Sequence, residues 1–416
     1  MGCISRVSDA VTVMADQIAD RPTPPVLDGI TVIDFGRYVA GPFCAALLAD
    51  FGARVIRVEK VGGGEDRYVV PVADGGEGAL FLQVNRNKQG MTLDPSQPQG
   101  RAVLARLVAT ADVVVANLPP QALAALGLDY AALAAIKPDI ILTMVTAFGQ
   151  GGPLSDKLGF DGIGQAMSGA IHLGGTPDQP ARALVPYIDF CTASLSAFGT
   201  VTALMARDKT GAGQVVDASL LLTGLSIANY ALVEQAVAAP NRAGLGNRGF
   251  ASAPNDMFRT TDGWVIVQSV GDAMFRRWAE LTDNTELVSD PRFANDVSRA
   301  KHGAVVSDLM AAWCETRSSA EVLDGLEQAR IPSGPVYAPQ QVLDDPHIGA
   351  LGYLQPVAYP GLANPAPIAD TPVNLSAEQG GIRDRAPQLG EHTDSILAEL
   401  GYSRAEIEQL RAARVI

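Results

Sequence analysis

The sequence is poor in cysteine and histidine, and neither residue type forms a cluster. Its four cysteines (Cys3, Cys44, Cys191 and Cys314) lie far apart without a CxxC pair, and the four histidines are scattered. This spacing argues against a disulfide framework and against a zinc site. Cysteines that stay reduced are typical of a reducing compartment, so we expect a cytoplasmic protein.

Positive charge is also scarce. The chain has 31 lysines and arginines against 45 aspartates and glutamates, which gives a formal net charge of −14. A surface of this sign repels nucleic-acid phosphates and anionic lipids, so we expect neither as a partner. The longest uncharged stretches, residues 190–206 and 218–233, contain several Ser, Thr or Asn residues and fall short of the roughly 20 residues that a membrane span needs. We interpret both stretches as buried helices.

Several enzyme signatures are missing. The sequence has no P-loop, no HExxH, no GxSxG, and no GxGxxG after its first predicted strand. These absences argue against a P-loop nucleotidase, a zinc protease, an α/β-hydrolase and a nicotinamide oxidoreductase. Any catalysis would have to come from a carboxylate, a lone histidine or a thiol.

What the sequence does contain is an alternation of short apolar strands with helical segments. Residues 30–35 (ITVIDF) and 54–59 (RVIRVE) have strand patterns, and residues 41–51 between them have helical spacing. Such a β-α-β unit predicts parallel strands and an α/β fold. Further strands are predicted at 112–116, 139–146 and 214–218, and further helices at 189–207 and 220–238.

The length of 416 residues favours two domains. The pattern changes near Pro240, and Pro332-Ser333-Gly334-Pro335 marks a return crossing. We therefore expect a large domain made of residues 26–224 and 331–416, with a smaller domain at 225–330 inserted into it. Residues 1–25 are interpreted as a flexible leader.

Three segments are candidates for a functional site, and each could also have a purely structural role. Gly41 and Pro42 either start a helix or bring backbone N–H groups toward a ligand. Arg86 and Lys88 belong to a solvated turn or contact a phosphate. Asp189 follows an extended segment and opens a helix, so it is an N-cap, a nucleophilic carboxylate, or both.

Strings along most of the chain resemble the family III CoA-transferases, which include formyl-CoA transferase, carnitine CoA-transferase and α-methylacyl-CoA racemase. The matching strings are LDGITVIDF (27–35) with AGP (40–42), LADFGARVIRVE (48–59), NRNK (85–88), QAMSG (165–169), DPRF (290–293) and LGEHT (389–393). One such string is weak evidence, but together they follow the family order from about residue 26 to the end.

This resemblance implies a Rossmann-like large domain, a small middle domain and an interlocked homodimer. It implies acyl-CoA and a small carboxylic acid as substrates, without a permanently bound cofactor. The nucleophile of the family matches Asp189, which would form an acyl-aspartyl anhydride and then an aspartyl-CoA thioester. The resemblance places CoA near Val39, Ala40, Lys60, Leu93 and Asn117.

This chain also departs from the family pattern. A lysine that contacts CoA in formyl-CoA transferase corresponds to about Ser96, and Leu118 replaces a common phenylalanine. Lys60, Arg86 or Lys88 are expected to compensate for the lost contacts. In some relatives a glycine-rich loop covers the site, and the candidate here is residues 244–249.

Two other functions stay open at this point. The racemase of the family has Gly-His-Asp where this chain has Gly159-Phe160-Asp161, and phenylalanine cannot carry the proton that racemisation needs. A non-catalytic acyl-CoA-binding protein is the second alternative, against which the retained Asp189 argues. The sequence names neither the donor acyl group nor the acceptor acid.

Overall fold

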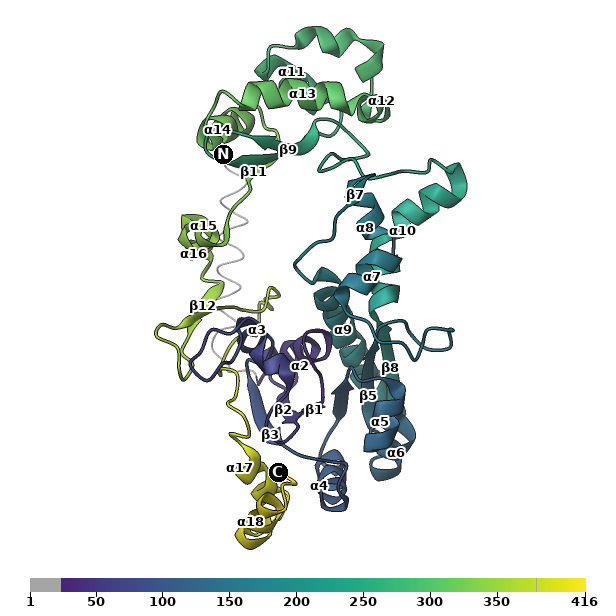
Figure 1. The fold of residues 1–416 in the computed structure, drawn as a ribbon, viewed down its shortest axis with the longest axis vertical. Helices are drawn as coiled ribbons and strands as arrows, with labels where there is room; N and C mark the ends of the chain where they lie inside the picture. Colours follow the sequence, from purple (N-terminus) through teal and green to yellow (C-terminus); the bar gives the residue numbers. More distant parts are fainter. Residues whose placement is uncertain (1–23, 379) are drawn as a thin grey trace. The chain divides into compact units, whose positions relative to one another are not determined.

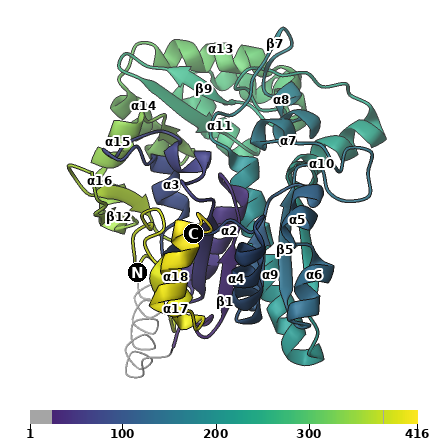
Figure 2. The same cartoon turned by 60° about the horizontal axis from the view of Figure 1, so that its bottom comes forward.

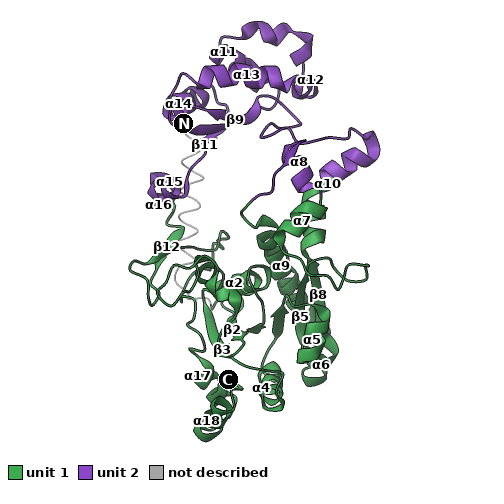
Figure 3. Cartoon of the chain, viewed as in Figure 1, with its two compact units in different colours: residues 1–168, 184–229, 351–416 green, residues 169–183, 230–350 purple. Residues whose placement is uncertain are grey.

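The computed structural model describes residues 24–378 and 380–416 (Figure 1). The chain divides into two compact units (Figure 3). Unit 1 comprises residues up to 168, 184–229 and 351–416, and unit 2 comprises residues 169–183 and 230–350. The leader expected over residues 1–25 lies almost wholly outside the described residues.

Unit 1 is built on a sheet of six strands in the order β3-β2-β1-β4-β5-β8. Every neighbouring pair is parallel, with Ile33 of β1 beside both Ile56 of β2 and Val114 of β4. The strands are β1 (Thr31–Asp34), β2 (Arg54–Glu59), β3 (Lys88–Thr92), β4 (Val113–Ala116), β5 (Ile141–Thr146) and β8 (Gln214–Ser219). This is the doubly wound α/β order, in which the chain reverses its direction of travel between β1 and β4.

Helices cover both faces of this sheet, because alternate strand residues point to opposite sides. Val32 and Val55 pack on one side against α2 (Ala40–Asp50) and the long α9 (Tyr187–Thr210). Ile33 and Ile56 pack on the other side, where the chain supplies α4 (Pro98–Ala109), α6 (Tyr130–Ile136), α17 (Thr393–Glu399) and α18 (Arg404–Ala412) (Figure 2). Both faces of the sheet are therefore buried over β1, β2, β4 and β5, as their valine and isoleucine runs require, whereas the edge strand β8 is largely exposed.

The other elements of unit 1 connect and flank this sheet. They are the 3₁₀ turn η1 (Glu65–Tyr68), α3 (Ala79–Val84), α5 (Pro120–Leu126), α7 (Asp161–Met167) and the strands β12 (Leu354–Val357) and β13 (Ala366–Ala369). Helix α10 (Leu220–Ala238) begins in unit 1 and ends in unit 2.

Unit 2 contains a three-stranded antiparallel sheet in the order β11-β10-β9. Its core gathers Phe275, Trp278, Phe293 and Met310 against Val265 and Val267 of the sheet. Its elements are α8 (Ala170–Leu173), β6 (Gly175–Thr176), β7 (Gln179–Pro180), β9 (Asn255–Arg259), β10 (Trp264–Gln268), α11 (Asp272–Leu281), η2 (Thr285–Ser289), η3 (Pro291–Phe293), α12 (Asp296–Lys301), α13 (Gly303–Cys314), α14 (Ser319–Gln328), β11 (Ser333–Pro335), α15 (Pro339–Asp344) and α16 (Pro346–Leu351), the last of which ends in unit 1.

The units differ from the expected domains at their edges. Unit 2 runs to residue 350 rather than 330, and it also takes in residues 169–183, which were expected in the large domain. This short segment forms the β6-β7 hairpin, and Gly175 of the hairpin pairs with Gly246. A pairing between residues some seventy positions apart cannot be predicted from the local sequence pattern.

Helices α9 and α10 are the two described helices that are long and apolar enough to cross a membrane by length and composition alone. Half of the apolar window of α9 is buried, which is typical of a core helix. In α10 only 22% of that window is buried, so the expectation of a buried helix is wrong for α10. Its exposed apolar side chains include Leu222, Tyr230 and Val237.

Candidate active site

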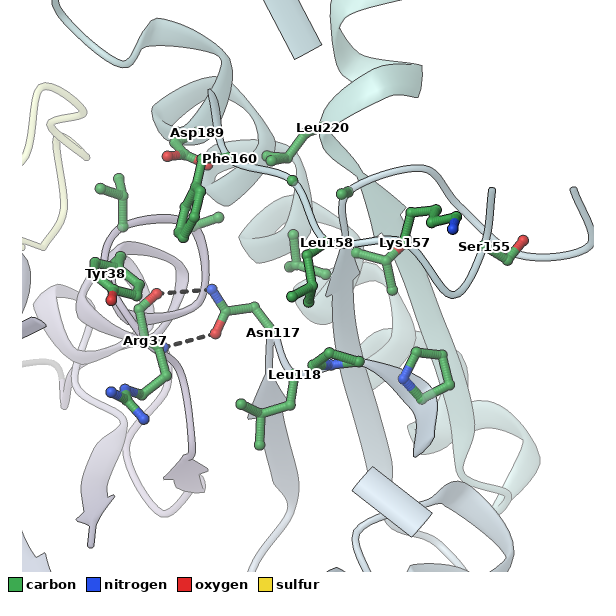
Figure 4. A pocket seen from close by; sticks show the side chains of 18 residues that line it. Arg37, Tyr38, Asn117, Leu118, Ser155, Lys157, Leu158, Phe160, Asp189 and Leu220 are labelled. Atoms are coloured by element: carbon green, nitrogen blue, oxygen red, sulfur yellow. Dashed lines mark hydrogen bonds between the residues drawn. The ribbon is translucent and has the colours of Figure 1, made fainter. Parts of the chain in front are cut away.

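A cavity of about 250 Å³ lies at the carboxyl edge of the parallel sheet, within unit 1 (Figure 4). It is lined by residues 37–40 after β1, 117–120 after β4, 145–147 at the end of β5, and Leu220 after β8. Ser155, residues 157–160 and Asp189 complete the lining. The cavity thus occupies the point where the strand order reverses, which is where doubly wound sheets bind ligands.

The turn that forms one wall of this cavity is held by Asn117. Its side-chain oxygen accepts the N–H of Arg37 at 2.7 Å, and its side-chain nitrogen donates to the carbonyl of Arg37 at 2.8 Å (Figure 4). The next residue, Tyr38, has a backbone φ of 61°, which residues other than glycine rarely adopt. No side chain caps α2, so the N–H groups of its first turn are left for water or a ligand.

Beneath this turn lies a buried network of paired charges. Lys88 donates to Asp34 at 2.7 Å, and the second oxygen of Asp34 accepts the N–H of Gly36 at 2.7 Å. Arg57 donates to the carbonyl of Gly36 at 3.1 Å and to Asp66 at 2.6 Å. Burial lowers the pKa of Lys88 to about 8, although the charge of Asp34 opposes the shift. The backbone turn at Gly36 is therefore held by hydrogen bonds to buried charged side chains and not by solvent.

This network corrects the expectation that Arg86 and Lys88 lie free to contact a phosphate. Arg86 is 1% exposed and pairs with Asp50 at 2.6 Å, and Lys88 is 3% exposed and donates to Asp34. Neither side chain lines the cavity. Both cations are used inside the protein, where a charge is tolerated only when it is paired.

The other predicted CoA contacts divide into two groups. Val39, Ala40 and Asn117 line the cavity together with Asp189. Leu93 is buried in the hydrophobic core, and Lys60 is exposed and paired with Glu65, so the structure does not bring these two to the cavity.

Asp189 lies in the first turn of α9 and is 9% exposed. The N-cap of this helix is Pro186, so the interpretation of Asp189 as an N-cap is wrong. No donor reaches the Asp189 carboxylate within the described part of the chain. Burial, assisted by the charge of Asp161, raises the pKa of Asp189 to about 7. A carboxylate with this pKa is more basic than usual, which favours nucleophilic attack near neutral pH.

Asp161 provides the cap that α9 lacks. One oxygen of its carboxylate accepts the N–H of Ile188 at 2.8 Å and the N–H of Asp189 at 3.2 Å. The other oxygen accepts from Gln165 at 2.5 Å. This contact was not predicted from the sequence, and the available signal was the position of Asp161 in the Gly159-Phe160-Asp161 string.

Two cations that were not predicted from the sequence also line the cavity. Arg37 pairs with Asp66 at 2.9 Å and also with Glu65. Lys157 is exposed, and the described residues offer it no ion pair. Lys157 therefore offers positive charge to an anionic group in the cavity, whereas the charge of Arg37 is offset by Glu65 and Asp66.

Aromatic side chains form the wall between Asp189 and the turn. The ring of Phe160 packs edge-to-face on Tyr38 with centroids 5.3 Å apart, and both residues line the cavity with Asp189 (Figure 4). No histidine is found among the described residues that line it, and His172 belongs to unit 2, where it bonds the carbonyl of Arg242. The proton carrier of the racemase is thus replaced by a phenyl ring.

Comparison with known proteins decides the family. The family model described as CoA-transferase family III matches residues 27–393. The chain belongs to the family III CoA-transferases. The protein is a CoA-transferase, as its relatives are.

Two curated relatives indicate the range of the family. The chain is 35% identical to the succinyl-CoA–D-citramalate CoA-transferase of Chloroflexus aurantiacus, over 96% of this chain and 100% of that protein. It is 32% identical to the succinate–glutarate CoA-transferase of Agrobacterium fabrum, over 92% of this chain and 98% of that protein.

A solved structure agrees with this assignment. A CaiB/BaiF family protein from Brucella suis superimposes with a TM-score of 0.79 and 30% identity, covering 91% of this chain and 100% of that chain. The α/β fold with a parallel central sheet is therefore that of the family.

Proposed function

We propose that this CoA-transferase moves CoA from an acyl-CoA thioester to a free carboxylic acid through covalent intermediates on Asp189. The observation that carries the proposal is that Asp189 is the one carboxylate among the described residues that line the cavity, where neither histidine nor cysteine accompanies it. The other groups in this cavity that could act as nucleophiles are hydroxyls and the amine of Lys157. We assign the role to Asp189 because it is a buried carboxylate and matches the nucleophile that the family resemblance implies.

The steps balance without a net proton. An oxygen of Asp189 attacks the donor thioester, the C–S bond breaks, and an anhydride and CoA thiolate result. The thiolate attacks the aspartyl carbonyl, the donor acid leaves, and an aspartyl-CoA thioester remains. The acceptor carboxylate then attacks this thioester to form a second anhydride, and the released thiolate takes the acceptor acyl group. Asp189 is regenerated.

For the substrates, we propose dicarboxylic acids and their CoA thioesters. The two curated relatives described above are named for succinate, citramalate or glutarate, all of which carry a second carboxylate. Lys157 supplies positive charge at the same cavity, which suits anionic substrates. We propose that Val39, Ala40 and Asn117, which line the same cavity, border the bound thioester.

Trapping of the intermediates tests the nucleophile. The enzyme is incubated with succinyl-CoA and hydroxylamine, and peptide mapping should place a hydroxamate on Asp189. The Asp189→Asn variant should stay folded, bind CoA and lose roughly 10³-fold or more in rate. Asp156→Asn, which removes an exposed carboxylate of the nearby loop, serves as the matched control. Near-native transfer by Asp189→Asn would refute the proposal.

The substrate range is tested separately with a matrix of acyl-CoA donors and carboxylic acids, read by mass spectrometry of the CoA products. Dicarboxylic acceptors should exceed monocarboxylic acids of the same length. Equal rates with both classes would contradict the proposed substrate class without affecting the nucleophile.

We also propose a homodimer. Exposed apolar side chains gather on α9 and α10, among them Phe198, Leu222, Tyr230 and Val237. Two helices with this many exposed apolar groups are typical of an interface. A dimer should persist on dilution to nanomolar concentration, and an active monomer would refute this. The cytoplasmic location stays a prediction.

A further inference from the structure

Asp161 and Asp189 are separated by 28 residues, yet their helices meet at the cavity. Asp161 is the first residue of α7, and the residue is 8% exposed. It accepts the N–H groups of Ile188 and Asp189, the second and third residues of α9. These are backbone donors that a helix cannot satisfy by itself. The cap of α9 is therefore supplied by another helix.

The close approach of α7 to α9 depends on Gly164. A Cβ at this position would lie 2.9 Å from Ile188 and 3.2 Å from the carbonyl of Leu220. Contacts this short require the neighbouring atoms to shift, so any larger residue would push the two helices apart. The absent side chain thus sets how near the Asp161 carboxylate lies to the start of α9.

The second consequence of this arrangement is electrostatic. A carboxylate that caps the helix also places its charge beside the Asp189 carboxylate, which raises the basicity of the nucleophile. The titratable groups nearest to Asp189 along its own helix are Tyr187 and Cys191. Those that line the cavity together with Asp189 are Arg37, Tyr38 and Lys157. Among these groups, Asp161 is the one that bonds directly to the backbone of the nucleophile.

We propose that Asp161 is a positioning residue for the transfer reaction, which fixes the first turn of α9 and whose charge adds to the effect of burial on the pH range in which Asp189 attacks. The proposal rests on the proposed role of Asp189 as the nucleophile. It assigns to Asp161 no contact with substrate, and its effect passes through Asp189 alone.

The test is the pH dependence of transfer from succinyl-CoA. For the native enzyme, the rate should rise with pH through a midpoint near 7, because Asp189 must lose its proton to attack. Asp161→Asn keeps an oxygen that accepts the N–H groups and removes the charge. We expect it to fold, to lose roughly tenfold or less in the plateau rate, and to shift the midpoint down by about half a unit or more.

Two further variants make the result specific. Asp156→Asn removes an exposed carboxylate five residues away and should leave the midpoint where it is. Gly164→Ala displaces α7 from α9, so it should lower both the rate, by roughly 10- to 100-fold, and the midpoint. If Asp161→Asn gives no folded protein, the shift of the pH midpoint is measured in Gly164→Ala instead.

A merely structural Asp161 would lower the rate equally at every pH, and an unmoved midpoint in Asp161→Asn therefore overturns the proposal. An equal shift in Asp156→Asn overturns it too, because the effect would then belong to the overall charge. The hydroxylamine trap separates this outcome from a failure of the proposed function. If native Asp189 is labelled and the midpoint does not move, only the role of Asp161 falls; if Asp189 is unlabelled and Asp189→Asn is active, both fall.

Discussion

The free energy of folding should depend on pH through Asp189, and Asp189→Asn should remove that dependence. The pKa of this carboxylate is raised from 3.8 to about 7 in the folded protein. Between these values the folded state holds a proton that the unfolded chain has released. The stabilisation is therefore present at low pH and is lost as the pH rises through about 7.

The size of the effect follows from the shift. Each pH unit within the window changes the free energy of unfolding by about 1.4 kcal/mol, so native stability should fall by about 2 to 3 kcal/mol between pH 5 and pH 8 from this group alone. Asn carries no charge to bury and should not show this fall. With an unfolding entropy of about 2.1 cal/mol/K per residue, the difference corresponds to about 3 °C in melting temperature.

The assay compares melting temperatures of the native enzyme and of Asp189→Asn at pH 5 and pH 8. Between pH 5 and pH 8, the melting temperature of Asp189→Asn should rise by about 3 °C relative to that of the native enzyme. Asp308→Asn, which removes an exposed carboxylate of α13, is the control for the loss of one negative charge and should show the same difference at both pH values. If the gap between Asp189→Asn and native protein is the same at pH 5 and pH 8, the Asp189 carboxylate is not shifted as the structure indicates.

Three further predictions concern the cavity and the chemistry. Asn117→Leu removes both hydrogen bonds that hold Arg37, so KM for the acyl-CoA should rise about 10- to 30-fold in initial-rate measurements; an unchanged KM would show that the turn needs no such support. Because Phe160 carries no proton, solvent deuterium should not enter the α-carbon of a 2-methylacyl-CoA at a catalytic rate, and fast exchange seen by mass spectrometry would restore the racemase alternative. Because a carboxylate nucleophile requires no metal, activity should survive exhaustive EDTA treatment. Activity lost there and regained with a divalent cation would contradict this.

Five of the six strands of the sheet could be predicted from sequence because each forms a short apolar run, whereas β3, which begins at Lys88, has no such run. The predicted strand at 54–59 matches β2 residue for residue, and the predicted helix at 220–238 matches α10. Short apolar runs that alternate with helical segments are typical of the buried parallel strands of an α/β fold. The family resemblance suggested Asp189 as the nucleophile, a role that local patterns alone could not distinguish from that of a helix cap.

The site was less accessible to sequence reasoning because its contacts join distant residues. Arg86 and Lys88 have the composition of a solvated turn, but their partners Asp50 and Asp34 lie 36 and 54 residues earlier in the chain. The same holds for the cap that Asp161 gives to α9. Pairing over such distances depends on how the elements pack, and a local pattern contains no information about it.

The paired charges beneath the Gly36 turn also restrict how this enzyme can diverge. Arg57, Lys88, Asp34 and Asp66 are all nearly inaccessible to water, so removing any one of them strands an uncompensated charge in the interior. Such a loss costs about 3 to 5 kcal/mol, a large share of the stability of a typical protein. Changes here should therefore occur as compensating pairs, whereas cavity residues such as Leu158 and Phe160 can vary singly. New substrate preferences can then arise at the cavity wall while the support of the turn stays fixed.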